Sequence, residues 1–223
     1  MKKIVVVIIV LLFVSSIKAQ FSVGIGPSSF VGIGSSPSGE GFATRYGISA
    51  FYEQPRNEIN TFYLRGILTL PINRFDSLNV SHKPNVPPGS GPSVLTVDLR
   101  RRTTMFSIDG GTRTYFFNTY EVGTAFYGSL HLRGIIASYN EELGEYDESI
   151  YEPSNPIPGI QYSLLMGVGG NLGVKYQLPY KGIITFDAAI DLIRRLHDPA
   201  FILVNDISPL SLTFNLAYRF DWY

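Results

Sequence analysis

Apolar and polar residues alternate with a period of two along most of the chain after residue 20. The clearest segment is 210–222, in which every second residue from Leu210 to Trp222 is apolar and the residues between them are small, polar or charged. Because successive side chains of a β-strand point to opposite faces, this pattern predicts a strand with one apolar face. A helix over the same residues would bury half of the charges.

The same two-face pattern recurs often enough to build a closed sheet. It is found in seven further segments, at about residues 21–34, 45–53, 62–70, 106–116, 126–136, 162–178 and 184–192. Several of these are much longer than the usual strand of about 5–6 residues. No stretch after residue 20 offers about 18 consecutive apolar residues, so we expect no membrane helix there. The sequence predicts eight strands, an even number.

The connections between the predicted strands alternate in length. The short ones lie at 54–58, 118–121 and 179–181. The long ones lie at 73–101, 138–159 and 196–209, and they hold 9 of the 14 prolines. Up-and-down barrels of the bacterial outer membrane have this asymmetry, with short periplasmic turns and longer extracellular loops. We therefore expect an all-β fold, an eight-stranded antiparallel up-and-down transmembrane β-barrel.

The charged residues of the predicted strands fall on one face only. An Arg or Lys on the lipid-facing side costs roughly 2–4 kcal/mol at mid-bilayer, so the uncharged face should meet lipid and the charged face should be enclosed. An eight-stranded barrel is only wide enough for side chains, and buried charges must be paired. We predict a lumen network formed by Arg45, Glu53, Arg65, Asp109, Arg113, His131, Arg133, Lys175, Asp187, Asp191 and Arg219. The alternative is a wetter lumen with solvated charges.

Aromatic residues gather where the strands should end on the periplasmic side. They are Tyr52, Phe62, Phe116, Phe126, Tyr176, Tyr180, Tyr218, Phe220 and Trp222. A soluble lipocalin-like barrel would share the alternation but needs no such aromatic girdle, so the girdle favours the membrane barrel.

The start of the chain is typical of an export signal. Lys2 and Lys3 precede an apolar run over 4–14, and Ala19 offers a small residue for cleavage. The run is shorter than the roughly 20 residues that a spanning helix needs. We expect a signal peptide at 1–19 and a barrel domain at 20–223. The chain has no cysteine, which excludes disulfides and a lipoprotein anchor. Its 18 basic and 18 acidic residues balance, so no overall positive charge is available to bind nucleic acid.

Three stretches carry a resemblance to a known family. The signal end Ala19-Gln20, the segment 108–117 (IDGGTRTYFF) and the closing Ala217-Tyr-Arg-Phe220 resemble the small outer-membrane β-barrel proteins of the Bacteroidota. The resemblance implies a protein of the cell outer membrane with no cofactor and no catalytic residues. Its last strand resembles the signal read by the barrel assembly machinery, with Tyr218, Phe220 and Trp222 as the aromatic residues. Some relatives serve secretion or gliding machinery, so an envelope protein partner is one expectation.

Candidate chemistry outside this framework is sparse. Ser129 and His131 share one strand face, as a lipid-modifying barrel enzyme would need, but they are predicted to point into the lumen. The three histidines His82, His131 and His197 have no ligand spacing, so no metal site is expected.

A basic run, Arg100-Arg101-Arg102, should lie near the outer leaflet, where outer-membrane lipid and lipopolysaccharide phosphates are the expected partners.

The sequence therefore favours a non-enzymatic outer-membrane barrel with a side-chain-filled lumen, whose long loops serve structural or partner-binding roles. A narrow porin-like transporter of a small or hydrophobic solute is the alternative, and a lipid-modifying barrel enzyme is a third hypothesis.

Overall fold

Ten β-strands form one antiparallel sheet that closes on itself. In this computed structural model the described residues are 21–33, 42–87, 91–121, 123–153, 159–179, 182–196 and 208–222. The predicted signal peptide at 1–19 lies outside them. The strands are β1 (Phe21–Ile33), β2 (Phe42–Pro55), β3 (Asn60–Thr69), β4 (Ile72–His82), β5 (Val94–Phe116), β6 (Ala125–Leu143), β7 (Tyr151–Pro153), β8 (Gln161–Gln177), β9 (Ile183–Arg195) and β10 (Leu210–Trp222).

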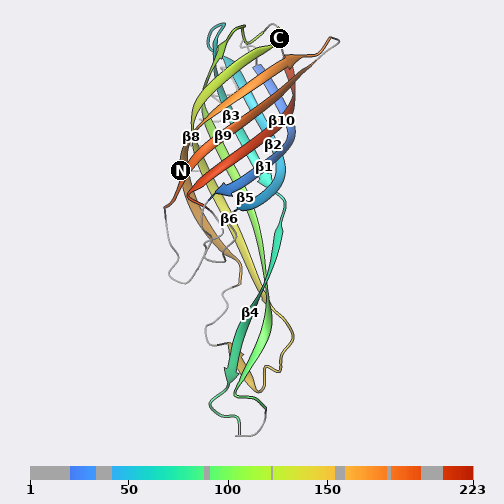
Figure 1. Ribbon diagram of the computed structural model, residues 1–223, viewed down its shortest axis with the longest axis vertical. Coiled ribbons are helices and arrows are strands. Elements are labelled where there is room, and N and C mark those ends of the chain that lie inside the picture. The colour runs from blue at the N-terminus through green and yellow to red at the C-terminus, as the bar shows by residue number, and fades with distance from the viewer. Residues whose placement is uncertain are drawn as a thin grey trace, which may run out of the picture.

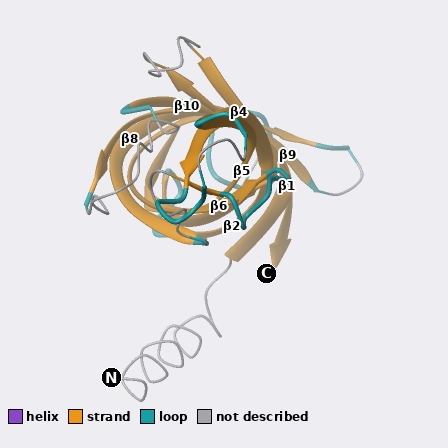
Figure 2. Cartoon of the chain, turned by 90° about the horizontal axis from the view of Figure 1, so that it is seen from below, coloured by secondary structure: helices purple, strands orange, loops and turns teal. Residues whose placement is uncertain are grey.

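Eight of these strands make the barrel. Around the wall the order is β1, β2, β3, β5, β6, β8, β9 and β10, and the pairing of β1 with β10 joins the ends of the chain. The pairing of β3 with the second half of β5, from Phe106 to Thr114, closes the ring that Figure 2 shows from one end. The predicted eight-stranded antiparallel all-β barrel is confirmed. Among the described residues no helix is long and apolar enough to cross a membrane.

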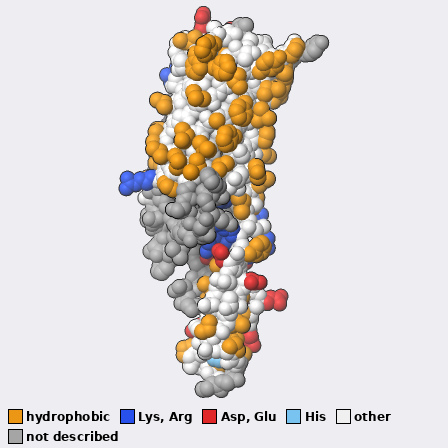
Figure 3. Space-filling model, in the orientation of Figure 1, with side chains coloured by type: hydrophobic (Ala, Val, Ile, Leu, Met, Phe, Trp, Pro, Cys, Tyr) orange, Lys and Arg blue, Asp and Glu red, His pale blue; other side chains and the backbone are white. Residues whose placement is uncertain are grey.

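The barrel presents its uncharged strand faces to the outside. Leu130 and Leu132 on β6 are 78% and 64% exposed, while His131 between them is 3% exposed. Exposed apolar side chains cover the visible barrel wall (Figure 3). The side chains predicted to face outward and those predicted to face inward therefore lie on the expected sides of the wall. A slip of one residue would have exchanged the two faces.

Two of the predicted loops are wrong in part, because they contain strands. Residues 73–101 hold nearly all of β4 and the first part of β5, which pair from Ile72 with Thr103 to Ser81 with Val94. Residues 138–159 hold the end of β6 and the short β7, which pairs with β4. In Figure 1 these strands continue beyond one end of the barrel. Prolines in the connection and consecutive charges at Arg100–Arg102 obscured the alternation there.

We call β4, β5 up to Thr103, β6 from Asn140, β7 and their connections the distal lobe. It has a small core of its own, in which Val80, Val97 and Tyr151 are buried together. The Tyr151 hydroxyl donates to the carbonyl of Pro92 (3.1 Å), and its ring meets the His82 ring edge-on, with centroids 5.0 Å apart. The lobe is therefore a folded sheet, held apart from the barrel core.

The Tyr151 ring should hold this lobe together without supporting the barrel. Replacing Tyr151 with Ala removes its packing and its hydrogen bond, and truncation of a large buried aromatic costs about 3–5 kcal/mol. Hydrogen exchange should therefore accelerate in β4, β7 and the first half of β5, and stay unchanged in β8 to β10. Phe75→Ala is the matched control, because Phe75 lies on the same lobe but is 74% exposed. Equal acceleration in both variants, or in the barrel, would contradict a separate lobe core.

Candidate functional site

The barrel interior contains a continuous chain of ion pairs, which begins at the end with the short turns. Arg219 on β10 places Nε 2.7 Å from Oδ1 of Asp221. Its Nη1 lies 3.8 Å from Oε2 of Glu53 on β2, and Arg113 on β5 approaches the same oxygen to 3.0 Å. Glu53 thus links three strands that are far apart in sequence.

Two aspartates carry the chain across the middle of the lumen. Asp187 on β9 accepts from Nη1 of Arg65 (2.7 Å) and lies 3.6 Å from Nη2 of Arg113. Asp109 on β5 accepts from Nε of Arg65 (3.1 Å) and from Nη2 of Arg133 (3.0 Å). Each aspartate therefore bridges two arginines.

The chain ends at Asp191, toward the distal lobe. One oxygen of Asp191 lies 2.7 Å from Nη1 of Arg133, and the other lies 2.7 Å from Nε2 of His131. The chain as a whole joins four arginines and His131 to five carboxylates, and it uses β2, β3, β5, β6, β9 and β10. Every side chain in it except Asp221 is at most 4% exposed, so each charge depends on its partners instead of on water.

Neutral groups and aromatic rings also contact some of these charged side chains. Thr61 and the hydroxyl of Tyr115 donate to Oε1 of Glu53, at 2.6 and 2.8 Å. The guanidinium of Arg113 lies 4.4 Å from the ring centroid of Tyr63 and 4.6 Å from that of Tyr127, within the range of cation–π attraction. Hydrogen bonds and rings of this kind offset part of the cost of burying charge.

Two predicted lumen residues have different surroundings. Lys175 is buried on β8, where its ammonium donates to the backbone carbonyl of Tyr120 and lies 5.7 Å from the ring centroid of Tyr115. Arg45 is buried on the inner face of β2. The structure thus places all eleven residues of the predicted set inside the barrel and joins nine of them in the ion-pair chain, together with Asp221.

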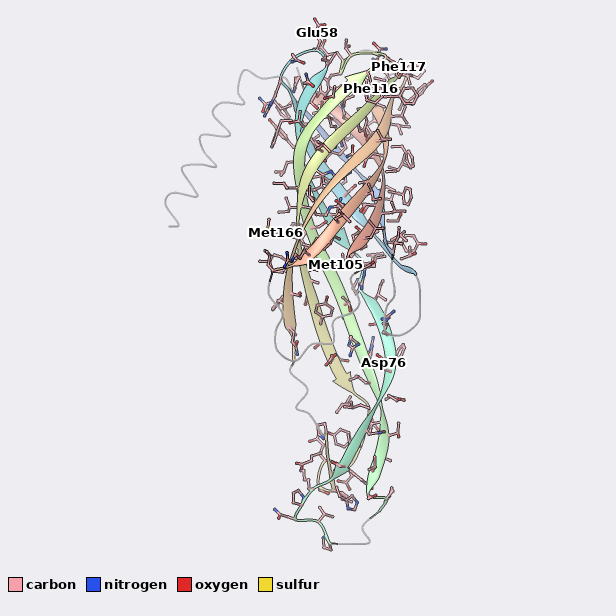
Figure 4. All side chains as sticks on the ribbon, turned by 60° about the vertical axis from the view of Figure 1, so that its left-hand side comes forward. Glu58, Asp76, Met105, Phe116, Phe117 and Met166 are labelled. Atoms are coloured by element: carbon pink, nitrogen blue, oxygen red, sulfur yellow. The ribbon has the colours of Figure 1, made fainter. Side chains whose placement is uncertain are left out.

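An apolar layer fills the lumen at the lobe end. It is formed by Phe30, Met105, Ile135, Ala137, Tyr139, Leu165 and Ile193, which pack as one buried cluster. Figure 4 shows Met105 where the barrel gives way to the distal lobe. Sequence reasoning missed this layer, although a signal was present: the inward positions of β5, β6 and β9 change from charged to apolar toward the long connections.

Tyrosines close the opposite end. Tyr115, Tyr120, Ala125 and Tyr127 form a second buried cluster, and the ring of Tyr120 lies 4.1 Å from the guanidinium of Arg219. The ion-pair chain, apart from the partly exposed Asp221, therefore lies between two layers of apolar and aromatic side chains.

The residues suggested for catalysis do not form a catalytic pair in the described part of the chain. His131 contacts Asp191, whereas the hydroxyl of Ser129 lies 3.2 Å from that of Tyr63. No hydrogen bond joins Ser129 to His131. Across the described ranges no three His, Cys, Asp or Glu side chains come together as metal ligands.

Exposed aromatic residues mark the end of the barrel with the short turns. Phe117 is 90% exposed and stands edge-on between Phe116 and Phe126, with ring centroids 5.8 and 5.9 Å away. Its backbone φ is 69°, a left-handed conformation that is costly for a bulky residue. Figure 4 shows Phe116 and Phe117 at this rim.

The final strand closes the barrel against the first. Phe21 faces Trp222 in the β1–β10 register, and Phe220 is 46% exposed with its ring 4.6 Å from that of Tyr218. The side chain of Trp222 lies outside the described residues. Tyr218 and Phe220 thus form an aromatic pair at the seam of the barrel.

The basic run on β5 is divided between two faces. Arg101 turns inward, with Nε 2.7 Å from Glu141 and Nη1 3.5 Å from Asp76. Arg100 and Arg102 are exposed on the outer face and form no ion pair with a described residue. The sequence pattern predicts this run just outside a strand, but the run lies within β5, where alternation leaves only Arg100 and Arg102 on the outer face.

Comparison with solved structures identifies similar barrels. Neisserial surface protein A has a TM-score of 0.53 and 13% identity, over 92% of this chain and 100% of that one. Ail, the attachment invasion locus protein of Yersinia pestis, has a TM-score of 0.46 and 13% identity, over 92% and 100%. The outer membrane protein OprG from Pseudomonas aeruginosa has a TM-score of 0.46 and 13% identity, over 91% of this chain and 96% of that one. No protein-family model matches the chain, and no curated protein matches it. At this identity the first comparison establishes a shared fold.

Removing one carboxylate from the ion-pair chain should destabilise the barrel strongly. Glu53→Gln leaves Arg113 and Arg219 without their shared anion, and breaking a buried pair in this way costs about 3–5 kcal/mol of unfolding free energy. Urea unfolding in lipid vesicles measures the loss. Asp98→Asn, at an exposed lobe position, is the control and should change the free energy by less than about 0.5 kcal/mol. A similar small loss in both variants would show that the interior charges are solvated.

Proposed function

We propose that this protein is a non-enzymatic integral barrel of the bacterial outer membrane, with a closed lumen and a distal lobe that binds a partner outside the cell. The observation that carries the proposal is the inversion of polarity across the wall. Apolar side chains such as Leu64, Leu132 and Val168 are about half or more exposed, while the lumen arginines are buried. Exposure of so much apolar surface to water is unfavourable, whereas the hydrocarbon core of a membrane can cover it.

The ends of the barrel support an orientation. The end with the short turns carries the exposed Phe116, Phe117 and Phe126 and belongs at the periplasmic interface, where aromatic rings are favoured. The distal lobe then projects from the cell. The same proposal includes three further points. The signal at 1–19 directs export, and the barrel assembly machinery inserts the chain by recognising Tyr218, Phe220 and Trp222. The chain belongs to the small outer-membrane barrels of the Bacteroidota.

The two closing layers favour a structural or binding role over transport. One layer is the apolar cluster around Ile135 and Leu165, and the other is the tyrosine cluster around Tyr127. Within the described residues, these two layers separate the charged centre of the lumen from both ends of the barrel. A narrow transporter needs a continuous path, and an enzyme needs a nucleophile beside its base, which Ser129 and His131 do not provide. The distal lobe, with its own core, is the feature that remains available for recognition.

The purified chain, folded in lipid vesicles, should resist carbonate extraction and show no stable open level in planar-bilayer recordings. The lumen is occupied by paired side chains, and ions have no water-filled route through it. Folding is checked in the same sample by the mobility shift between heated and unheated protein. Release by carbonate would remove the membrane assignment, and a steady large conductance would replace the closed lumen with the transporter hypothesis.

The outward arginines of β5 should contact lipopolysaccharide phosphates at the outer leaflet. Arg102 lies four residues beyond the exposed Phe106 along β5, a distance of about 13 Å at the usual strand rise. Arg100→Gln combined with Arg102→Gln should reduce the lipopolysaccharide that co-purifies with the barrel. Arg56→Gln, at the opposite rim, should leave the amount unchanged. Equal lipid in the double variant and the control would exclude this contact.

A further inference from the structure

A shallow, open groove lies on the outer wall of the barrel between β8 and β9. It has a volume of about 340 Å³ and is lined by Met166, Gly167, Val168, Leu192, Ile193 and Arg194. The register sets Met166 opposite Arg194 and Val168 opposite Leu192, and these four side chains point outward. Gly167 and Ile193 point inward, so their backbone forms the floor. In Figure 4 Met166 lies at the lobe end of the barrel wall.

The polarity of the groove changes along its length. Val168 and Leu192, on the side nearer the barrel middle, are 55% and 63% exposed. Arg194 is the next outward residue of β9 toward the lobe, and it is the first charged side chain on that face of the strand. On a lipid-facing wall the cost of an Arg falls from about 2–4 kcal/mol at mid-bilayer to about 0–1 kcal/mol near the interface. Arg194 therefore fits the level of the headgroups.

Arg194 differs from the lumen arginines in what surrounds it. Arg101 and the lumen arginines lie against carboxylates, but Arg194 is exposed and forms no ion pair with a residue in the described ranges. Its cross-strand neighbour is the apolar Met166. A guanidinium binds phosphate or carboxylate oxygens through two parallel hydrogen bonds, so this position is complementary to an anionic group.

We propose that this groove is a binding site for an anionic lipid, with one acyl chain along Met166, Val168 and Leu192 and the charged headgroup at Arg194. The groove spans three residues of each strand, about 7 Å at the usual strand rise, so it accommodates part of a single acyl chain. The site rests on the proposed function, because it requires the lobe end of the barrel to lie at the membrane surface. It lies on β8 and β9, and is thus distinct from the outward arginines of β5.

Native mass spectrometry of the folded full chain in a neutral detergent tests the site, with dodecyl phosphate below its micelle concentration as the probe. The unmodified protein should retain one copy. Arg194→Gln removes the charge-assisted contact and should weaken binding about tenfold or more. Val168→Trp fills the groove and should abolish binding. Both positions face outward, so neither variant disturbs the ion-pair chain, and the heat-dependent mobility shift confirms folding.

Matched variants separate this site from general lipid adhesion. Arg56→Gln changes an exposed arginine at the other rim, and Leu172→Trp adds an indole to the outer wall away from the groove, so both should bind like the unmodified chain. Unchanged binding in Val168→Trp, or equal loss in Leu172→Trp, overturns the groove. If inorganic phosphate binds as well as dodecyl phosphate, the acyl chain contributes nothing, and the proposed lipid site is reduced to a simple anion contact. A barrel that inserts into vesicles yet fails these comparisons disproves the lipid site and leaves the proposed function intact.

Discussion

The narrow interior of an eight-stranded barrel is the constraint on which the rest of the structure depends. Once the wall turns its uncharged faces outward, every inward charge must find its partner within a space that holds only side chains. Asp109 and Asp187 meet this requirement by bridging two arginines each, and Glu53 does so through Arg113, Arg219 and two hydroxyls. Because the partners lie on strands distant in sequence, the chain of ion pairs couples closure of the barrel to correct pairing of its strands.

Alternation predicted the faces because it is a local property of the backbone. Whether a residue such as Arg65 or Leu64 points inward depends only on its place along the strand, so one sequence is enough to decide it. Which carboxylate meets which arginine depends on the stagger between strands, and no period-two pattern contains that information. The inward position of Arg133 was thus predictable, whereas its two partners, Asp109 and Asp191, were not.

The distal lobe was missed for a related physical reason. Its strands bury one face only partly and carry charges on both faces, as at Arg101 and Arg102, so the contrast between faces is weak. The lobe gains its order from contacts that close over a long separation in sequence, such as Tyr151 with Val80 and Pro92. The apolar layer at the lobe end of the lumen was visible in principle, since Met105, Ile135 and Ile193 continue the inward phase of strands already identified.

The continuity of β5 and β6 determines what the lobe can do. β5 runs without interruption from Val94 to Phe116, so the same ladder of hydrogen bonds that closes the barrel with β3 also builds the lobe with β4. No linker separates the two parts along this strand, and the register of β5 with β6 is kept from Leu99 to Phe116. A bend between lobe and barrel would break ladder bonds in both strands at once. The lobe therefore continues the barrel wall without a hinge loop. For the partner binding proposed above, such a surface loses less conformational entropy on binding than a flexible loop would.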